Sequence, residues 1–249
     1  MKKSVIALMA LAGVAMATEP VTLTPLTEEG WSHTVRTGKT ATWSQNATSG
    51  TLTLDNSNWS QTSATYDLAT NLGGTLGFSV DITRGSVSGG VSFVLIGTEK
   101  SLTLGTKGYT DGTLFYGTSD NVTASSYYLN EAWENGTTMD SSSLLSSACN
   151  YNATATLTGS TAVNAEGNTI LTLTASSTSA DSTATVNIDL GKNFVLDKIM
   201  FCGDGANNAT GIWTISNLSV TGTPVIPEPS TATLSLLALC GLASRRRRK

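Results

Sequence analysis

The chain has 249 residues, which is enough for one domain with a sizeable core, and only 13% of them are charged. Its formal net charge is −4, but half of the 14 basic residues lie in the first three and last five positions, so the stretch between carries seven basic residues against 18 acidic ones. An acidic surface of this kind repels nucleic acids and anionic lipids, and we therefore exclude nucleic-acid binding.

The N-terminus has the three regions of a secretory signal peptide. Two lysines follow Met1, an apolar run extends over Val5–Val14, and the small residues Ala15 and Ala17 mark a cleavage site after Ala17. We predict that residues 1–17 form a signal helix and that the protein is exported. An uncleaved membrane anchor is the alternative interpretation.

Residues 18–223 form the predicted body, in which apolar residues alternate with Thr and Ser in short runs. A period of two is typical of strands with one buried face, and β-branched threonine favours strands. Many short strands separated by turns predict an all-β fold, an antiparallel β-sandwich or jelly roll. The predicted strands are Thr51–Leu54, Leu76–Ile82, Val91–Ile96, Leu102–Leu104, Thr113–Tyr116, Thr154–Thr158, Thr169–Thr174, Thr183–Leu190, Val195–Phe201 and Ile212–Val220.

Glycine-rich and asparagine-rich stretches predict the turns between these strands. Two of them, Asn71–Gly74 and Gly203–Gly205, interrupt or follow predicted strands. Only Ser126–Glu134 and Asp140–Cys149 have the length and composition for one or two helical turns, which we expect as insertions between strands.

The strand order resembles that of the concanavalin-A-like, laminin-G-type jelly rolls. The resemblance rests on Leu76–Ile82 followed by Val91–Ile96, and on Val195–Phe201 followed by Ile212–Val220 at the close. It implies a fold that has been used for glycan binding, glycan hydrolysis and protein adhesion, and the fold alone does not choose among these functions.

The sequence shows no assembled catalytic group. A retaining glycosidase needs two carboxylates ~5–5.5 Å apart, and no predicted strand carries such a pair. The acidic pair Glu131 and Glu134 lies in a predicted loop or helical turn, and His33, the only histidine, has no nucleophile-elbow motif beside it. We therefore predict no catalytic residue, no enzyme activity and no cofactor.

Several residues of the body are candidates for binding. Trp59 and Trp133 lie in predicted loops, where an exposed indole can stack on a sugar ring, whereas Trp213 lies in a strand and is predicted to be core. Asp204 and Asn207 offer oxygen atoms for a calcium ion, but their loop lacks the spacing of an established calcium site, and a plain turn is the alternative.

Two cysteines remain in the exported body. An oxidising compartment permits a disulfide between Cys149 and Cys202, which would close a loop of about 50 residues. The alternative is two separated, buried thiols, because a disulfide requires Cα atoms within ~7 Å.

The last residues, 224–249, combine three unlike elements in a fixed order. Pro227, Glu228 and Pro229 form a rigid, extended triplet. An uncharged apolar segment follows at 230–244, which predicts a short transmembrane helix although a full span needs ~20 residues. A basic cluster, which would hold the helix orientation, ends the chain: Arg245, Arg246, Arg247, Arg248 and Lys249.

This tail resembles the PEP-CTERM sorting signal of bacterial envelope proteins. The resemblance implies that an exosortase-type membrane protease and the secretion machinery are partners, and that the tail holds the protein in the membrane at least transiently. It also implies a destination in the cell envelope or extracellular matrix. An ordinary C-terminal membrane anchor is the alternative.

Together these patterns predict an exported envelope or matrix protein with a non-enzymatic, structural or adhesive role. One alternative is a carbohydrate-binding module of the lectin or laminin-G type that contacts envelope polysaccharide. A divergent glycoside hydrolase is the other.

Overall fold

The computed structural model describes residues 19–35, 41–57, 61–85, 89–106, 112–120, 142–205 and 210–225. These residues form 14 strands in one hydrogen-bonded network and a 3-10 helix, which confirms the predicted all-β sandwich or jelly roll. In chain order the elements are β1 (Val21–Leu23), η1 (Pro25–Thr27), β2 (Trp31–Val35), β3 (Ala41–Asn46), β4 (Thr51–Ser57), β5 (Gln61–Arg84), β6 (Gly89–Gly97), β7 (Lys100–Thr106), β8 (Leu114–Asp120), β9 (Ser142–Leu145), β10 (Thr154–Val163), β11 (Asn168–Ser177), β12 (Ala180–Lys192), β13 (Leu196–Gly205) and β14 (Thr210–Pro224).

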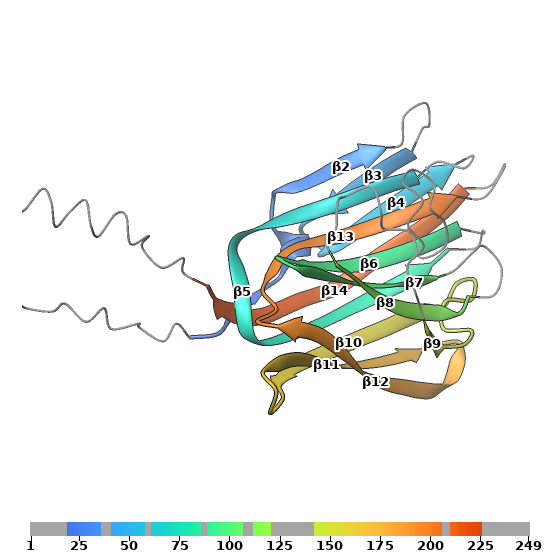
Figure 1. Ribbon diagram of the computed structural model, residues 1–249. Helices are drawn as coiled ribbons and strands as arrows, with labels where there is room; N and C mark the ends of the chain where they lie inside the picture. Colours follow the sequence, from blue (N-terminus) through green and yellow to red (C-terminus); the bar gives the residue numbers. More distant parts are fainter. Residues whose placement is uncertain are drawn as a thin grey trace, which may run out of the picture.

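The strands form two packed layers that share β5 (Figure 1). The first sheet has the order β2-β5-β13-β6-β7-β8-β9, and the second has the order β3-β4-β14-β5-β10-β11-β12 with β1 added to β14. Residues 61–72 of β5 pair in the first sheet, and residues 72–83 and Arg84 pair in the second. One long, bent strand therefore joins the two layers.

Two predicted turns are parts of strands. At Asn71–Gly74 the chain bends without ending β5, and Gly74 takes a left-handed φ of 67° that suits glycine. Gly203–Gly205 continues β13 and pairs with β5 and β6. Glycine marks a local bend, but the pairing with neighbouring strands decides whether the strand ends there.

The predicted helical insertion at Asp140–Cys149 is also wrong within the described residues, because Ser142–Leu145 forms the short strand β9 beside β8. The other predicted insertion, Ser126–Glu134, lies outside the described residues. None of the helices among the described residues is long and apolar enough to cross a membrane.

The core lies between the layers and contains a row of packed aromatic rings. The Trp31 ring stacks on Phe201 at 5.9 Å between centroids, Phe201 stacks on Phe93 at 5.0 Å, and Phe93 meets Phe78 edge-on at 5.6 Å. Trp213 is fully buried, which confirms its predicted place in the core.

Both ends of the described chain leave the sandwich on the same side, which we call the terminal end (Figure 1). Val21 at the start of β1 pairs with Gly222 of β14, and the Val225 amide donates to the Asn71 carbonyl at 2.8 Å. The opposite side, where β5 ends at Arg84, is called the distal end. The predicted signal peptide and nearly all of the predicted sorting tail lie outside the described residues.

Candidate functional site

The distal end contains a buried arginine because of the period of β5. Val80 and Ile82 point into the core and are fully buried, so Arg84, two residues further, points the same way. Its side chain is only 1% exposed. A charge in such a place is costly unless polar or aromatic groups surround it.

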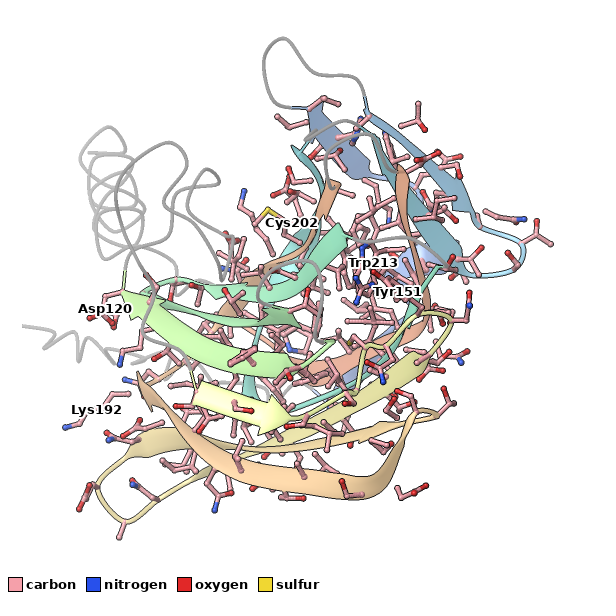
Figure 2. The ribbon with its side chains drawn as sticks, turned by 90° about the vertical axis from the view of Figure 1, so that its right-hand side faces the viewer. Asp120, Tyr151, Lys192, Cys202 and Trp213 are labelled. Atoms are coloured by element: carbon pink, nitrogen blue, oxygen red, sulfur yellow. The ribbon has the colours of Figure 1, made fainter. Side chains whose placement is uncertain are left out.

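Arg84 meets such groups from the neighbouring loop and strand. Its Nη1 donates to the Cys149 carbonyl at 3.0 Å, and its guanidinium carbon lies 4.3 Å from the centroid of the Tyr151 ring and 5.7 Å from that of Trp213. Cation–π attraction is strongest when the cation is shielded from water. Arg84 therefore holds the Tyr151 ring against the end of the sandwich, and Figure 2, which faces this end, shows Tyr151 beside Trp213.

The turn that carries Tyr151 is fixed on both sides by backbone hydrogen bonds. The Cys149 amide donates to Gly112 at 2.7 Å, and the Ala153 amide donates to Asn150 at 3.0 Å. Asn152, the next residue, has a left-handed φ of 59° that asparagine tolerates. The backbone thus presents Tyr151 in a defined position.

Tyr151 is 49% exposed although one face of its ring rests on Arg84. Asn150 and Asn152 flank it and carry amide groups that both donate and accept hydrogen bonds. A fixed ring with polar neighbours can stack on an apolar face of a ligand while the amides bind its hydroxyl groups. Because the ring is already held, binding loses little side-chain entropy.

Cys149, the cysteine at this site, is unreactive at neutral pH, and the candidate disulfide is not formed. Burial raises the pKa of the Cys149 thiol to about 12, although the charge of Arg84 acts in the opposite direction, so the thiol stays protonated at neutral pH. Cys149 belongs to the main core, whereas Cys202 packs with Val94 and Met200 in a separate cluster, and both are free thiols. The alternative of two separated, buried thiols is therefore the one that the structure has.

Five of the body residues singled out from the sequence lie outside the described part of the chain: Trp59, Trp133, Glu131, Glu134 and Asn207. Asp204 lies in β13, and its side chain is not described. The strands that flank Trp59 end at Ser57 and begin at Gln61, and those that flank Asn207 end at Gly205 and begin at Thr210. All four strand ends lie at the distal end (Figure 1). The contact with Arg84 places Tyr151 at this end as well.

His33 lies in β2 at the edge of the first sheet. Its Nε2 is hydrogen-bonded to the Thr62 hydroxyl, and its ring lies 5.3 Å from that of Trp43. Thr62 also donates to the Thr34 carbonyl at 3.1 Å, so its hydroxyl is part of the pairing between β2 and β5. Within the described ranges, no group of three His, Cys, Asp or Glu side chains is placed to hold a metal ion.

Tyr151 is not among the candidates predicted from the sequence, because the exposed rings predicted there are tryptophans only. The alternation Val80, Ile82, Arg84 is a usable signal, since it places a cation at an inward position. The ring above this cation belongs to Tyr151, 67 positions later in the chain. This contact depends on the tertiary fold and has no local signal in the sequence.

No protein-family pattern and no curated protein sequence matches the chain. Solved structures with a similar fold include the CBM2 module of the evolved Dit protein of Lactobacillus casei BL23 phage J-1, with a TM-score of 0.46 at 8% identity, covering 84% of this chain and 98% of that one. The carbohydrate recognition domain of Emp47p has a TM-score of 0.44 at 14% identity, covering 82% and 95%.

Enzymes are also among the similar structures. The PL-14 alginate lyase from Aplysia kurodai has a TM-score of 0.45 at 11% identity and covers 74% of this chain and 87% of that one. The prediction that the chain is not an enzyme is therefore corrected, because proteins of this fold include catalysts and the lack of a sequence motif does not exclude activity.

Proposed function

We propose that this chain is an exported envelope protein that binds polysaccharide at its distal end. The observation that supports the proposal is the Tyr151 ring, half exposed to solvent yet fixed by Arg84 and flanked by two asparagines. A ring held in this way offers a prepared surface for the apolar face of a sugar. Carbohydrate-binding modules and lectin domains are built on the same kind of jelly roll.

The proposal includes export through the signal peptide at 1–17 and sorting through the tail at 224–249. Both segments continue from the terminal end, where Val21 pairs with Gly222 and Val225 bonds to Asn71. Attachment of the protein through its tail would leave the distal end facing away from the membrane. This arrangement suits a protein that contacts envelope or matrix polysaccharide.

The test measures retention of the full chain on insoluble cellulose, chitin and the polysaccharide extracted from the native envelope. We expect retention on at least one of them, its loss in Tyr151→Ala, and its survival in Tyr151→Phe, which keeps the ring. Val163→Ala is the matched control, because Val163 is 64% exposed at the terminal end of β10. Absence of retention on every polymer, or equal retention of Tyr151→Ala and the parent, would contradict the proposal.

The same incubations report catalysis. Soluble reducing ends or unsaturated sugars released from a retained polymer would make that polymer a substrate and not only a ligand. Comparing the parent with Tyr151→Ala then shows whether the distal end is required for the reaction as well as for retention.

A further inference from the structure

The strand β12 forms a long free edge of the second sheet. It has 13 residues and, among the described strands, pairs only with β11. The strands at the other sheet edges are shorter, with four residues in β9, five in β2 and six in β3. β12 is thus the largest row of unpaired backbone groups that the described strands present.

This edge lacks the features that usually prevent strand pairing. Soluble proteins protect edge strands with charges, prolines, bulges or short length. In β12, residues 182–188 contain neither a charge nor a proline, and Ala184–Asp189 pairs with β11 in a regular register without a bulge. Between the irregular pairings at its two ends, the middle of this edge therefore carries no charge, proline or bulge that would oppose a further strand.

The core is also incompletely covered along β12. Ala184 and Val186 pack against the core but are only partly buried, whereas Ile188 and Leu190 are buried. β9 approaches β12 from the first sheet, and its flank is tied to the turn before β12, where the Ser179 hydroxyl donates to the Ser147 carbonyl. The incompletely covered part of β12 is consequently its middle, at Ala184 and Val186.

We propose that β12 pairs antiparallel with β12 of a second copy of this chain, about a two-fold axis at Asn187. This register places Val186 opposite Ile188 and Ala184 opposite Leu190, so the partly buried apolar residues meet apolar residues on the same face. Two-fold dimers are the commonest protein oligomers, and they require a self-complementary surface of this kind.

The charges of β12 fit the same arrangement. Asp189 lies opposite Thr185, so no carboxylate faces another, and the end that carries Lys192 meets the end that carries Asp181. Parallel pairing in register would instead place Asp189 against Asp189, which destabilises a sheet. This complementarity favours a second copy over an unrelated extended peptide.

The first test is the dissociation constant of the dimer, measured by sedimentation equilibrium on the full chain in a non-ionic detergent. Asn187→Asp places two carboxylates opposite each other on the axis, and we expect it to raise the dissociation constant about threefold or more. The exposed Asn187 side chain accepts a hydrogen bond from Thr172 at 2.9 Å, and aspartate can accept the same bond, so the monomer fold is kept. Thr158→Asp, two strands inward on the same exposed face, is the matched control and should change nothing.

The second test locates the contact by oxidative cross-linking. Asn187→Cys should form a disulfide-linked dimer on a non-reducing gel, whereas Thr158→Cys and the parent should not. A parent chain that sediments only as a monomer would overturn the proposal. A dimer whose dissociation constant does not change in Asn187→Asp would also overturn it, and so would equal cross-linking of Asn187→Cys and Thr158→Cys. Both outcomes would place the contact on another surface or on a different partner. Neither test involves polysaccharide, so its outcome is independent of the proposed function.

Discussion

Arg84 shows how one residue can determine both stability and surface chemistry. The period of β5 directs its charge into the sandwich, where the Cys149 carbonyl and two aromatic rings surround it. The same guanidinium packs against one face of the Tyr151 ring and holds it in place. A substitution at Arg84 should therefore change the fold stability and the candidate site together.

We expect Arg84→Ala to lower the free energy of unfolding by about 2–4 kcal/mol, because it leaves a cavity, an unpaired buried carbonyl and no cation under the ring. Urea unfolding followed by tryptophan fluorescence measures the effect. Lys198→Ala is the control, since Lys198 is 42% exposed and its ion pair with Asp67 should contribute less than about 1 kcal/mol. If Arg84→Ala lowered the free energy of unfolding no more than Lys198→Ala does, the structural role of Arg84 would be contradicted.

Tyr66 makes a second informative contact at the residue scale. Its hydroxyl donates to Glu28 Oε2, and its ring lies 5.5 Å from Trp31. Burial, followed by the hydrogen bond to the Glu28 carboxylate and the charge of that carboxylate, raises the pKa of Tyr66 to about 12. Tyr66 is therefore a stable hydrogen-bond donor and not a phenolate base at neutral pH.

The raised pKa of Tyr66 predicts a specific loss of stability in alkali. An unfolded tyrosine ionises near pH 10, so the contribution of Tyr66 is fully present below about pH 10 and is lost as the pH rises towards 12. Urea unfolding at a series of pH values should show a steeper decline in the parent than in Tyr66→Phe, which cannot ionise. Identical slopes would show that Tyr66 has the same pKa in the folded and unfolded chain.

At the scale of elements, two glycines in the contact between β10 and β5 have opposite surroundings. A Cβ atom on Gly159 would lie 2.2 Å from the Phe78 ring, in a place where the ring packs on the strand backbone. A Cβ atom on Gly77 would meet nothing closer than 3.8 Å. The first glycine is required by packing and the second is not.

This difference predicts opposite effects of the same substitution. Gly159→Ala should destabilise the protein by about 1–3 kcal/mol through overpacking. Gly77→Ala should be neutral or stabilise it by up to about 1 kcal/mol, because it restricts the unfolded chain without a clash. Thermal and urea unfolding of the two variants tests the pair, and equal destabilisation would mean that Phe78 does not pack as described.

Strands with clear alternation could be predicted from the sequence, whereas the connections between them could not. Each of the ten predicted strands overlaps an observed one. The first half of β5 was missed because residues 61–72 contain mostly polar and small side chains between the inward Ala64, Tyr66 and Leu68. The passage of β5 from one sheet to the other depends on pairing with β13, β14 and β10, which no local pattern reveals.

For the whole molecule, the sequence alone supplies a predicted destination but no signal for the candidate binding surface. The segments that predict export and sorting are continuous in the sequence, whereas the distal site combines Arg84, Tyr151 and Trp213 from distant positions. Such a set becomes visible only when the strands are paired. Both ends of the described chain leave the sandwich at the terminal end (Figure 1). Tyr151 contacts Arg84 at the opposite, distal end.

The proposed sorting predicts a processed C-terminus. Intact and C-terminal peptide mass of the protein recovered from its native envelope should show loss of residues beyond Pro227, Glu228 and Pro229. Recovery of the basic residues 245–249 on the mature protein would instead identify the tail as a permanent anchor and contradict the sorting signal.

Calorimetric titration of the full chain with soluble fragments of a polymer that retains it tests the proposed contact between Tyr151 and polysaccharide. We predict that Tyr151→Ala weakens binding about tenfold, whereas Tyr151→Phe and Val163→Ala bind like the parent. The melting temperature of each variant, measured together with its affinity, shows whether weaker binding comes from a lost contact or from unfolding. Equal affinity of the parent and a folded Tyr151→Ala would mean that Tyr151 does not contact the polysaccharide.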